Sequence, residues 1–220
     1  MFTKKIICLA NSIKINGRCV AGKEILGHNK FGNWIRPVSA RQKGELSVHE
    51  ISYDQVSCPK LLDIVTIPLR KRSPQTYQVE NTLIESGRKW VKSREFNKNS
   101  VAKMLDDVPT LWLNGWNSSN GMNDRIPQEI AEQQIISSLL LIKPISLRIH
   151  VEQEFKGKKA RAKFKYKGVE YWLVITDPLE EAYKKKPAGD YKISGEVFLC
   201  VSLGEPFDGW CYKLVAGVIR

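Results

Sequence analysis

The clearest pattern along the chain is an alternation of apolar and basic residues. Between positions 160 and 167, Ala, Phe and Tyr side chains alternate with Arg and Lys. A period of two predicts a β-strand with one buried face and one basic face. Lys167-Gly168 is expected to form a two-residue turn, because Gly tolerates a positive φ. The apolar run 171–175 then returns as the next strand.

The last 80 residues predict five strands and a helix. Apolar positions in 139–151 indicate one long first strand, bent at Pro144. A helix is expected from Pro178, capped by Asp177 or Thr176 and ending before Pro187 and Gly189. Two more strands are expected at 196–203 and 210–219. The order β-β-β-α-β-β is that of an OB barrel.

The first 84 residues predict a similar order less clearly. Strands are expected at 5–10, 18–26, 33–38, 62–69 and 77–84, with a turn at Asn16-Gly17 and a short helix or irregular turn in 48–56. No close internal sequence repeat accompanies this similarity.

The segment between the two barrels predicts helices and loops. Helices are expected at 100–105 and 128–136, separated by an Asn/Ser/Gly-rich loop that contains Trp112 and Trp116. The fold class is therefore mainly β: two OB-like five-stranded barrels (1–84 and 139–220) joined by a helix and loop segment (85–138) that packs against them.

Charge points to a polyanionic partner. The 220 residues carry 35 Lys and Arg against 23 Asp and Glu, a net charge of +12. By the expected segments, the net charge is +7 in 1–84, zero in 85–138 and +5 in 139–220. Such an excess is typical of nucleic-acid-binding proteins. A basic protein without a polyanionic partner is the alternative.

The basic strand gives the first candidate binding site. Its cations point to one side because they lie two residues apart: Lys159, Arg161, Lys163 and Lys165. The expected turn would pair Lys165 with Glu170 and Lys163 with Trp172. An aromatic ring among cations is what single-strand-binding proteins use to stack bases. The alternative is a solvated hairpin whose lysines provide solubility.

The N-terminal barrel gives a second group of candidates: Arg18, Lys23, Trp34 and Arg36. Trp34 and Arg36 should share a strand face. Arg36 inside a strand needs a partner, which could be a phosphate, water, or a carboxylate such as Glu24 or Asp63. Structural pairing is as good an interpretation as ligand binding.

Nothing in the sequence predicts catalysis. The three histidines lie apart without metal-ligand spacing, and there is no phosphate-binding loop or nucleophile motif. We therefore expect no enzyme activity, no cofactor and no metal site. The five cysteines are scattered, and Cys8, Cys200 and Cys211 lie in apolar runs, so we expect buried thiols in a reducing compartment. No apolar run is long enough to cross a membrane or to form a signal peptide, so we expect a cytoplasmic protein with no membrane partner.

An ordered set of sequence runs resembles a known family, the dual OB-fold-containing domain of prokaryotic conflict or defence systems. These runs extend over nearly the whole chain: KIICLANS, GRCVAGKEI, WIRPVS, LDIVTIPL with YQVEN, LW with NDRIP, FKYKGVEYWLVITDP and VSLGEPFDGWCYKLVAGVI. The resemblance implies two OB-like barrels and a nucleic-acid sensor or binding component that acts with effector proteins. It carries over no catalytic residues.

These observations predict a non-catalytic accessory or sensor protein that binds single-stranded DNA or RNA. A module that docks a partner effector, or binds a small ligand, is the alternative.

Overall fold

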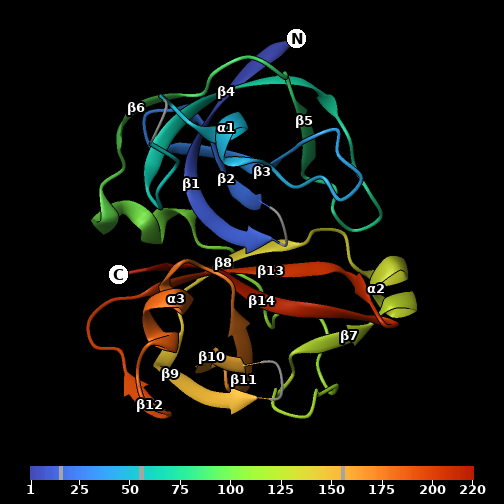
Figure 1. The fold of residues 1–220 in the computed structure, drawn as a ribbon, viewed down its shortest axis with the longest axis vertical. Helices are drawn as coiled ribbons and strands as arrows, with labels where there is room; N and C mark the ends of the chain where they lie inside the picture. The colour runs from blue at the N-terminus through green and yellow to red at the C-terminus, as the bar shows by residue number, and fades with distance from the viewer. Residues whose placement is uncertain (15–16, 55–56, 155–156) are drawn as a thin grey trace. The chain divides into compact units, whose positions relative to one another are not determined.

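The chain forms two compact units in a computed structural model, residues 1–104 and 105–220 (Figure 1). The structure describes residues 1–14, 17–54, 57–154 and 157–220. The expected connecting segment 85–138 is divided between the units, because 85–104 belongs to the first and 105–138 to the second. Each unit is described by itself.

The first unit is built on a five-stranded barrel. Its elements are β1 (Phe2–Lys14), β2 (Gly17–Gly27), β3 (Lys30–Val38), α1 (Val48–Ile51), β4 (Asp63–Arg72), β5 (Asn81–Ile84), β6 (Val91–Glu95) and the 3₁₀ helix η1 (Lys98–Met104). Strand order is β1-β2-β3-β5-β4, and β1 also pairs with β4, so the barrel closes. Only the β3–β5 pair is parallel among these. This is the OB order that the sequence predicts, with β6 added beside β4.

Alternation along the strands fills the first barrel. Ile6 and Cys8 of β1 join Val65 and Ile67 of β4 in the core. Strands β1 and β2 approach each other closely at Gly22 of β2. A Cβ atom at this position would lie 2.0 Å from the backbone oxygen of Ile7 in β1. Such a distance leaves no room for any side chain, so β1 and β2 can meet here only through Gly.

The second unit contains the other barrel. Its elements are β7 (Arg125–Pro127), α2 (Gln128–Gln134), β8 (Leu139–Ile142), β9 (Ile145–Glu154), β10 (Gly157–Tyr166), β11 (Val169–Ile175), α3 (Leu179–Lys184), β12 (Gly189–Lys192), β13 (Phe198–Phe207) and β14 (Trp210–Ile219). The sheet runs β12-β9-β10-β11-β14-β13-β8. The single first strand expected at 139–151 is two strands, because Lys143-Pro144 interrupts the pairing. β8 pairs with β13 and β9 with β10, so these halves close the barrel as one bent strand would.

The ends of the second barrel are covered by its own chain. Tyr183 of α3 joins the core, and so does Leu111 from the loop before β7. The Tyr166 hydroxyl donates to the Val108 carbonyl at 2.9 Å, and the Leu111 amide donates to the Tyr171 hydroxyl at 3.2 Å. The loop 106–114 is thereby attached to the barrel, as its Trp content suggests.

The β10–β11 hairpin follows its expected register. Lys163 faces Trp172 and Lys165 faces Glu170, as the sequence predicts. Lys167 and Gly168 form the turn with φ of 44° and 85°, so both residues, and not only Gly, adopt the left-handed conformation. The Asn16-Gly17 turn lies partly outside the described residues.

Three short strands, β6, β7 and β12, have no counterpart in the sequence prediction. The mainly β fold with two OB-like barrels is confirmed. Within the described ranges, no helix is both long and apolar enough to span a membrane.

Candidate nucleic-acid interface

Four strands of the second unit carry a continuous row of outward side chains. Lys192 of β12 faces Arg148 of β9, and Arg148 faces Lys163 of β10. Lys163 in turn faces Trp172 of β11. Directly paired residues in antiparallel strands point to the same side of the sheet. The row Lys192–Arg148–Lys163–Trp172 therefore places three cations beside one aromatic ring, spanning about 14 Å at the usual strand spacing.

The aromatic end of this row is held in a defined orientation. Trp172 Nε1 donates to the Glu170 carboxylate at 2.8 Å, and the Lys163 ammonium lies 4.0 Å from the ring centroid. The backbone of Trp172 also pairs with Met122. Arg148 and Lys192 are exposed. Neither has a side-chain hydrogen bond or ion pair with any part of the chain that the structure describes, so both can take phosphate oxygens.

The other candidates on β10 differ in availability. Lys165 is exposed opposite Glu170. Arg161 is only 5% exposed and its guanidinium pairs with Glu152, at 3.1 Å, and with Glu154. Lys159 lies opposite Glu152 in the register. Strand periodicity places Arg161 on the outward face correctly, but two carboxylates of β9 already neutralise it, so we leave it out of the interface.

The first barrel carries the same pair on the equivalent strands. Lys23 of β2 faces Trp34 of β3, and its ammonium lies 5.4 Å from the Trp34 ring centroid. In both barrels, the residue two positions after the Trp begins the parallel pairing with the last barrel strand. Lys23–Trp34 thus occupies the position of Lys163–Trp172, a similarity that the sequences alone do not show.

Here, however, the lysine is occupied by the chain itself. Lys23 is 8% exposed and donates to the Met104 carbonyl at 2.7 Å. Two further contacts hold the segment 96–104 against the β2–β3 hairpin: Phe96 packs edge-on to Phe31, and Lys103 donates to Asn29. Lys23 is therefore not available to a phosphate in the structure.

Arg36 and Arg18 are also engaged in the fold. Arg36 is buried and lies 3.8 Å from the carboxylate of Glu80, an acid that was not among the candidates considered from sequence. Arg18 pairs through its backbone with Leu46 and is partly buried. Both arginines belong to the first unit.

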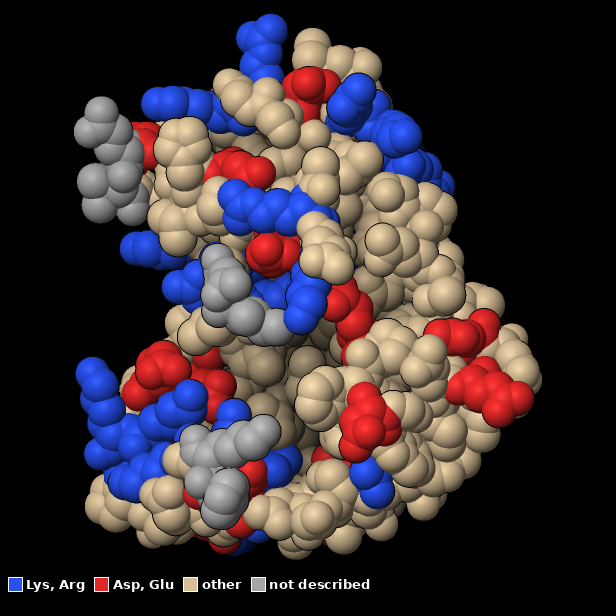
Figure 2. All heavy atoms as spheres, turned by 45° about the vertical axis from the view of Figure 1, so that its right-hand side comes forward, with Lys and Arg blue, Asp and Glu red and all other residues tan. Residues whose placement is uncertain are grey.

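Net charge is divided very unequally between the units. The first holds 19 Lys and Arg against 8 Asp and Glu, or +11, while the second holds 16 against 15, or +1. Figure 2 shows basic side chains spread over the first unit and both signs together on the second. Three consecutive exposed cations, Arg70, Lys71 and Arg72, end β4. None of these three, and neither Arg148 nor Lys192, is among the candidates predicted from sequence, although the run of three basic residues is apparent there.

A buried lysine shapes the electrostatics inside the second barrel. Lys213 of β14 is 1% exposed and donates to the Leu113 carbonyl at 2.6 Å and to Asn114 Oδ1 at 2.9 Å. Burial lowers the pKa of this ammonium to about 7, with the charge of Asp124 acting in the opposite direction. Its contacts attach the loop at 113–114 to the barrel, and it does not reach solvent.

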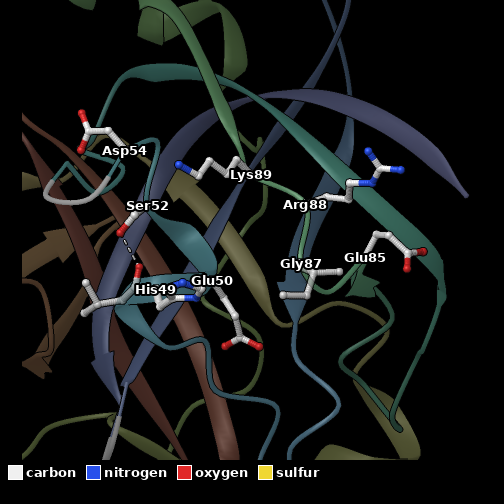
Figure 3. A pocket seen from close by; sticks show the side chains of 10 residues that line it. His49, Glu50, Ser52, Asp54, Glu85, Gly87, Arg88 and Lys89 are labelled. Carbon is white, nitrogen blue, oxygen red and sulfur yellow. Dashed lines mark hydrogen bonds between the residues drawn. The ribbon is translucent and has the colours of Figure 1, made fainter.

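The first unit also has a hollow beside α1, with a volume of about 470 Å³ (Figure 3). Lys89 is directed toward Ser52 and Asp54, whereas Arg88 and Glu85 extend away from them. The Ser52 hydroxyl donates to the Val48 carbonyl at 2.6 Å. Charges of both signs line this hollow without converging on one point, so we assign no ligand to it.

Within the described residues, no group of three or more His, Cys, Asp or Glu side chains is arranged to hold a metal ion. A model of the dual OB-containing domain family matches residues 4–218. Comparisons with curated proteins and with solved structures give no match.

Proposed function

The chain belongs to the dual OB-containing domain family, and from this premise we propose that it is a non-catalytic protein that binds single-stranded nucleic acid. OB barrels bind oligonucleotides mainly through the outer face of their second and third strands. In the second unit those strands are β10 and β11, which carry Lys163 and Trp172.

The observation that carries the proposal is the row Lys192–Arg148–Lys163–Trp172. Each of its three cations can neutralise a phosphate while a base stacks on Trp172. A base must compete with Lys163 for the ring. An exposed cation–π contact is worth about 0.5–1 kcal/mol, and stacking on an aromatic side chain about 1–3 kcal/mol per base. Stacking of a base on Trp172 is therefore favoured over the contact of the ring with Lys163, and the displaced ammonium becomes available to a phosphate.

The first unit contributes through its charge. A net +11 attracts a polyanion over distances comparable to the Debye length and raises the rate of encounter. The lysine of its own Lys23–Trp34 pair donates to the Met104 carbonyl, so we assign the specific contacts to the second barrel. A role as accessory or sensor component of a prokaryotic defence system is part of the proposal and rests on the resemblance of sequence runs.

Binding of a protein segment is the second candidate. One observation favours it: the Lys23 ammonium takes a peptide carbonyl, that of Met104. The equivalent Lys163 could take a carbonyl of a partner in the same way. Salt dependence separates the candidates, because nucleic-acid affinity falls steeply with salt through counterion release.

The test is fluorescence anisotropy with labelled oligo(dT) and oligo(U) over a range of salt concentrations. Replacement of Arg148, Lys163 and Lys192 by Gln should reduce the salt slope by about two units, since each phosphate contact in a single strand contributes about 0.7. In the control variant, Gln replaces Lys30, Lys43 and Lys60, which are exposed in the first unit. These substitutions remove the same number of positive charges.

We expect the control to change the slope by less than one unit. Equal slopes for the two triple variants would place the contacts elsewhere, and no salt-dependent binding by the parent would contradict the proposal. The labelled strand should stay intact throughout. Cleavage that a point substitution abolishes would show that the protein is an enzyme.

A further inference from the structure

The second unit contains an apolar cavity that shares no residue with the Lys192–Arg148–Lys163–Trp172 row. Its volume is about 390 Å³, within the range of specific binding pockets. The lining residues come from the loop before β7, from the end of α2 and the residues after it, and from β8; they include Val108, Trp112, Leu113, Ile135, Ile136 and Leu140. None of them is charged.

Two residues of this cavity are unusual. Ile136 is 84% exposed, the largest fraction among the large hydrophobic side chains of the described residues. Trp112 has a φ of +56°, which is a strained conformation for a bulky residue, and its Nε1 donates to the Ser137 carbonyl at 2.7 Å. Strained backbone of this kind is concentrated at ligand-binding positions. The cavity therefore has an apolar lining, and Ile136 of this lining is exposed to solvent.

The segment 105–138, which supplies most of the cavity's lining, is acidic in sequence, in contrast to the whole chain, although Asp107 is paired with Lys167 and Asp124 is buried. Residues 105–138 carry five acidic side chains and one basic, a net charge of −4 in a protein of +12. The basic one, Arg125, stacks on Trp210 at 3.9 Å. Glu129 and Glu132 are exposed on α2, whose last turn forms the rim. Figure 2 shows acidic side chains without basic neighbours on part of the second unit.

We propose that this cavity and α2 form a docking surface for a basic protein segment, one that inserts a large apolar side chain beside Trp112 and Ile136 and places Lys or Arg against Glu129 and Glu132. Complementary charge selects this partner. The same acidic residues repel phosphate, so nucleic acid does not fit here. The protein then has two separate surfaces, one for nucleic acid and one for protein.

The test is selection of peptides from a displayed random 12-residue library on the full chain, without nucleic acid. Peptides that bind the parent are counter-selected on the Ile136→Asp variant. The expected result is enrichment of sequences that combine Lys or Arg with a Trp, Phe or Leu. No enrichment, or enrichment of acidic or uncharged sequences, would overturn the proposal.

One enriched peptide is then measured against matched variants. Ile136→Asp should weaken its binding by about tenfold or more, the loss expected when a buried aliphatic contact is removed. Leu26→Asp, at a side chain 62% exposed in the first unit, is the control and should leave affinity unchanged. Glu129→Gln with Glu132→Gln should weaken binding up to about fivefold at low salt, whereas Glu205→Gln with Asp208→Asn should not.

Other occupants give other results. If Ile136→Asp converts a dimer of the parent into a monomer in analytical ultracentrifugation, the surface is occupied by a second copy and the proposal is wrong. Retained peptide binding in the variant with Gln at Arg148, Lys163 and Lys192 is expected. Its loss would show that the peptide binds the nucleic-acid row instead.

Discussion

Lys213 shows at the scale of a residue how a buried charge ties a loop to a barrel. Its ammonium donates to two oxygens of the loop at 113–114, and the Asp124 carboxylate lies near enough to raise the pKa, but burial dominates. Asp124 itself accepts from the Ser118 amide at 2.7 Å. The loop that covers one end of the second barrel thus depends on a group whose charge changes near neutral pH.

Lys213 predicts a pH dependence of stability. Its pKa is about 7 in the folded protein and near 10.5 when exposed. Between these values the unfolded chain binds more protons, so the free energy of unfolding should rise with pH from about 7 to 10.5. Below pH 7 this contribution is lost. Urea unfolding of the parent and of Lys213→Met across this range should show a smaller rise in the variant.

Lys192→Met, at an exposed lysine, is the control for this measurement and should keep the rise of the parent. Identical pH profiles for Lys213→Met and the parent would mean that Lys213 titrates normally.

Sequence periodicity predicts the direction of a side chain better than its availability. Lys163, Lys165 and Trp172 lie where the alternation places them. Arg161 shares their face, yet Glu152 and Glu154 of β9 neutralise it, because register with a neighbouring strand decides which charges meet. The register of β9 against β10 could not be predicted from the sequences of β10 and β11 alone. Arg148 of β9 and Lys192 of β12 were not predicted for the same reason, because their place beside Lys163 depends on strand pairing.

At the scale of elements, the first strand of each barrel must pair with two neighbours. β1 does so as one strand with a register shift between Cys8 and Ala10. In the second barrel, Lys143-Pro144 interrupts the first strand, so β8 pairs with β13 and β9 pairs with β10. The sequence predicts the bend, since Pro cannot donate to the ladder, but not that pairing stops there. The strands β6, β7 and β12 are short or polar, and nothing in their own residues distinguishes them from loops.

The close approach of β1 and β2 gives a test of the first barrel. Gly22→Ala should destabilise the protein by about 1–3 kcal/mol, because its methyl group would overlap the Ile7 carbonyl and force the strands apart. Gly27→Ala is a matched control at the end of the same strand, where a Cβ would meet nothing within 4 Å. Chemical denaturation measures both. Equal stability of the two variants would contradict the strand packing described for Gly22.

At the scale of the whole molecule, the two barrels share a Lys–Trp pair but differ in its use. The first unit carries nearly all of the net charge and has Lys23 engaged with Met104, whereas the second is almost neutral and has its pair beside available cations. We therefore propose that general attraction and specific contact belong to different units. Composition predicts a polyanionic partner, but only the division of the chain reveals which unit carries the charge.

The most direct test of the central claim compares two aromatic substitutions in the second unit. Trp172→Ala should weaken binding of a single-stranded oligonucleotide about 5- to 150-fold, with little change in salt slope, because stacking is worth about 1–3 kcal/mol and carries no counterion release. Phe207→Ala removes an aromatic ring that is 70% exposed outside the row and should bind as the parent does. Unchanged affinity of a folded Trp172→Ala variant would contradict the account.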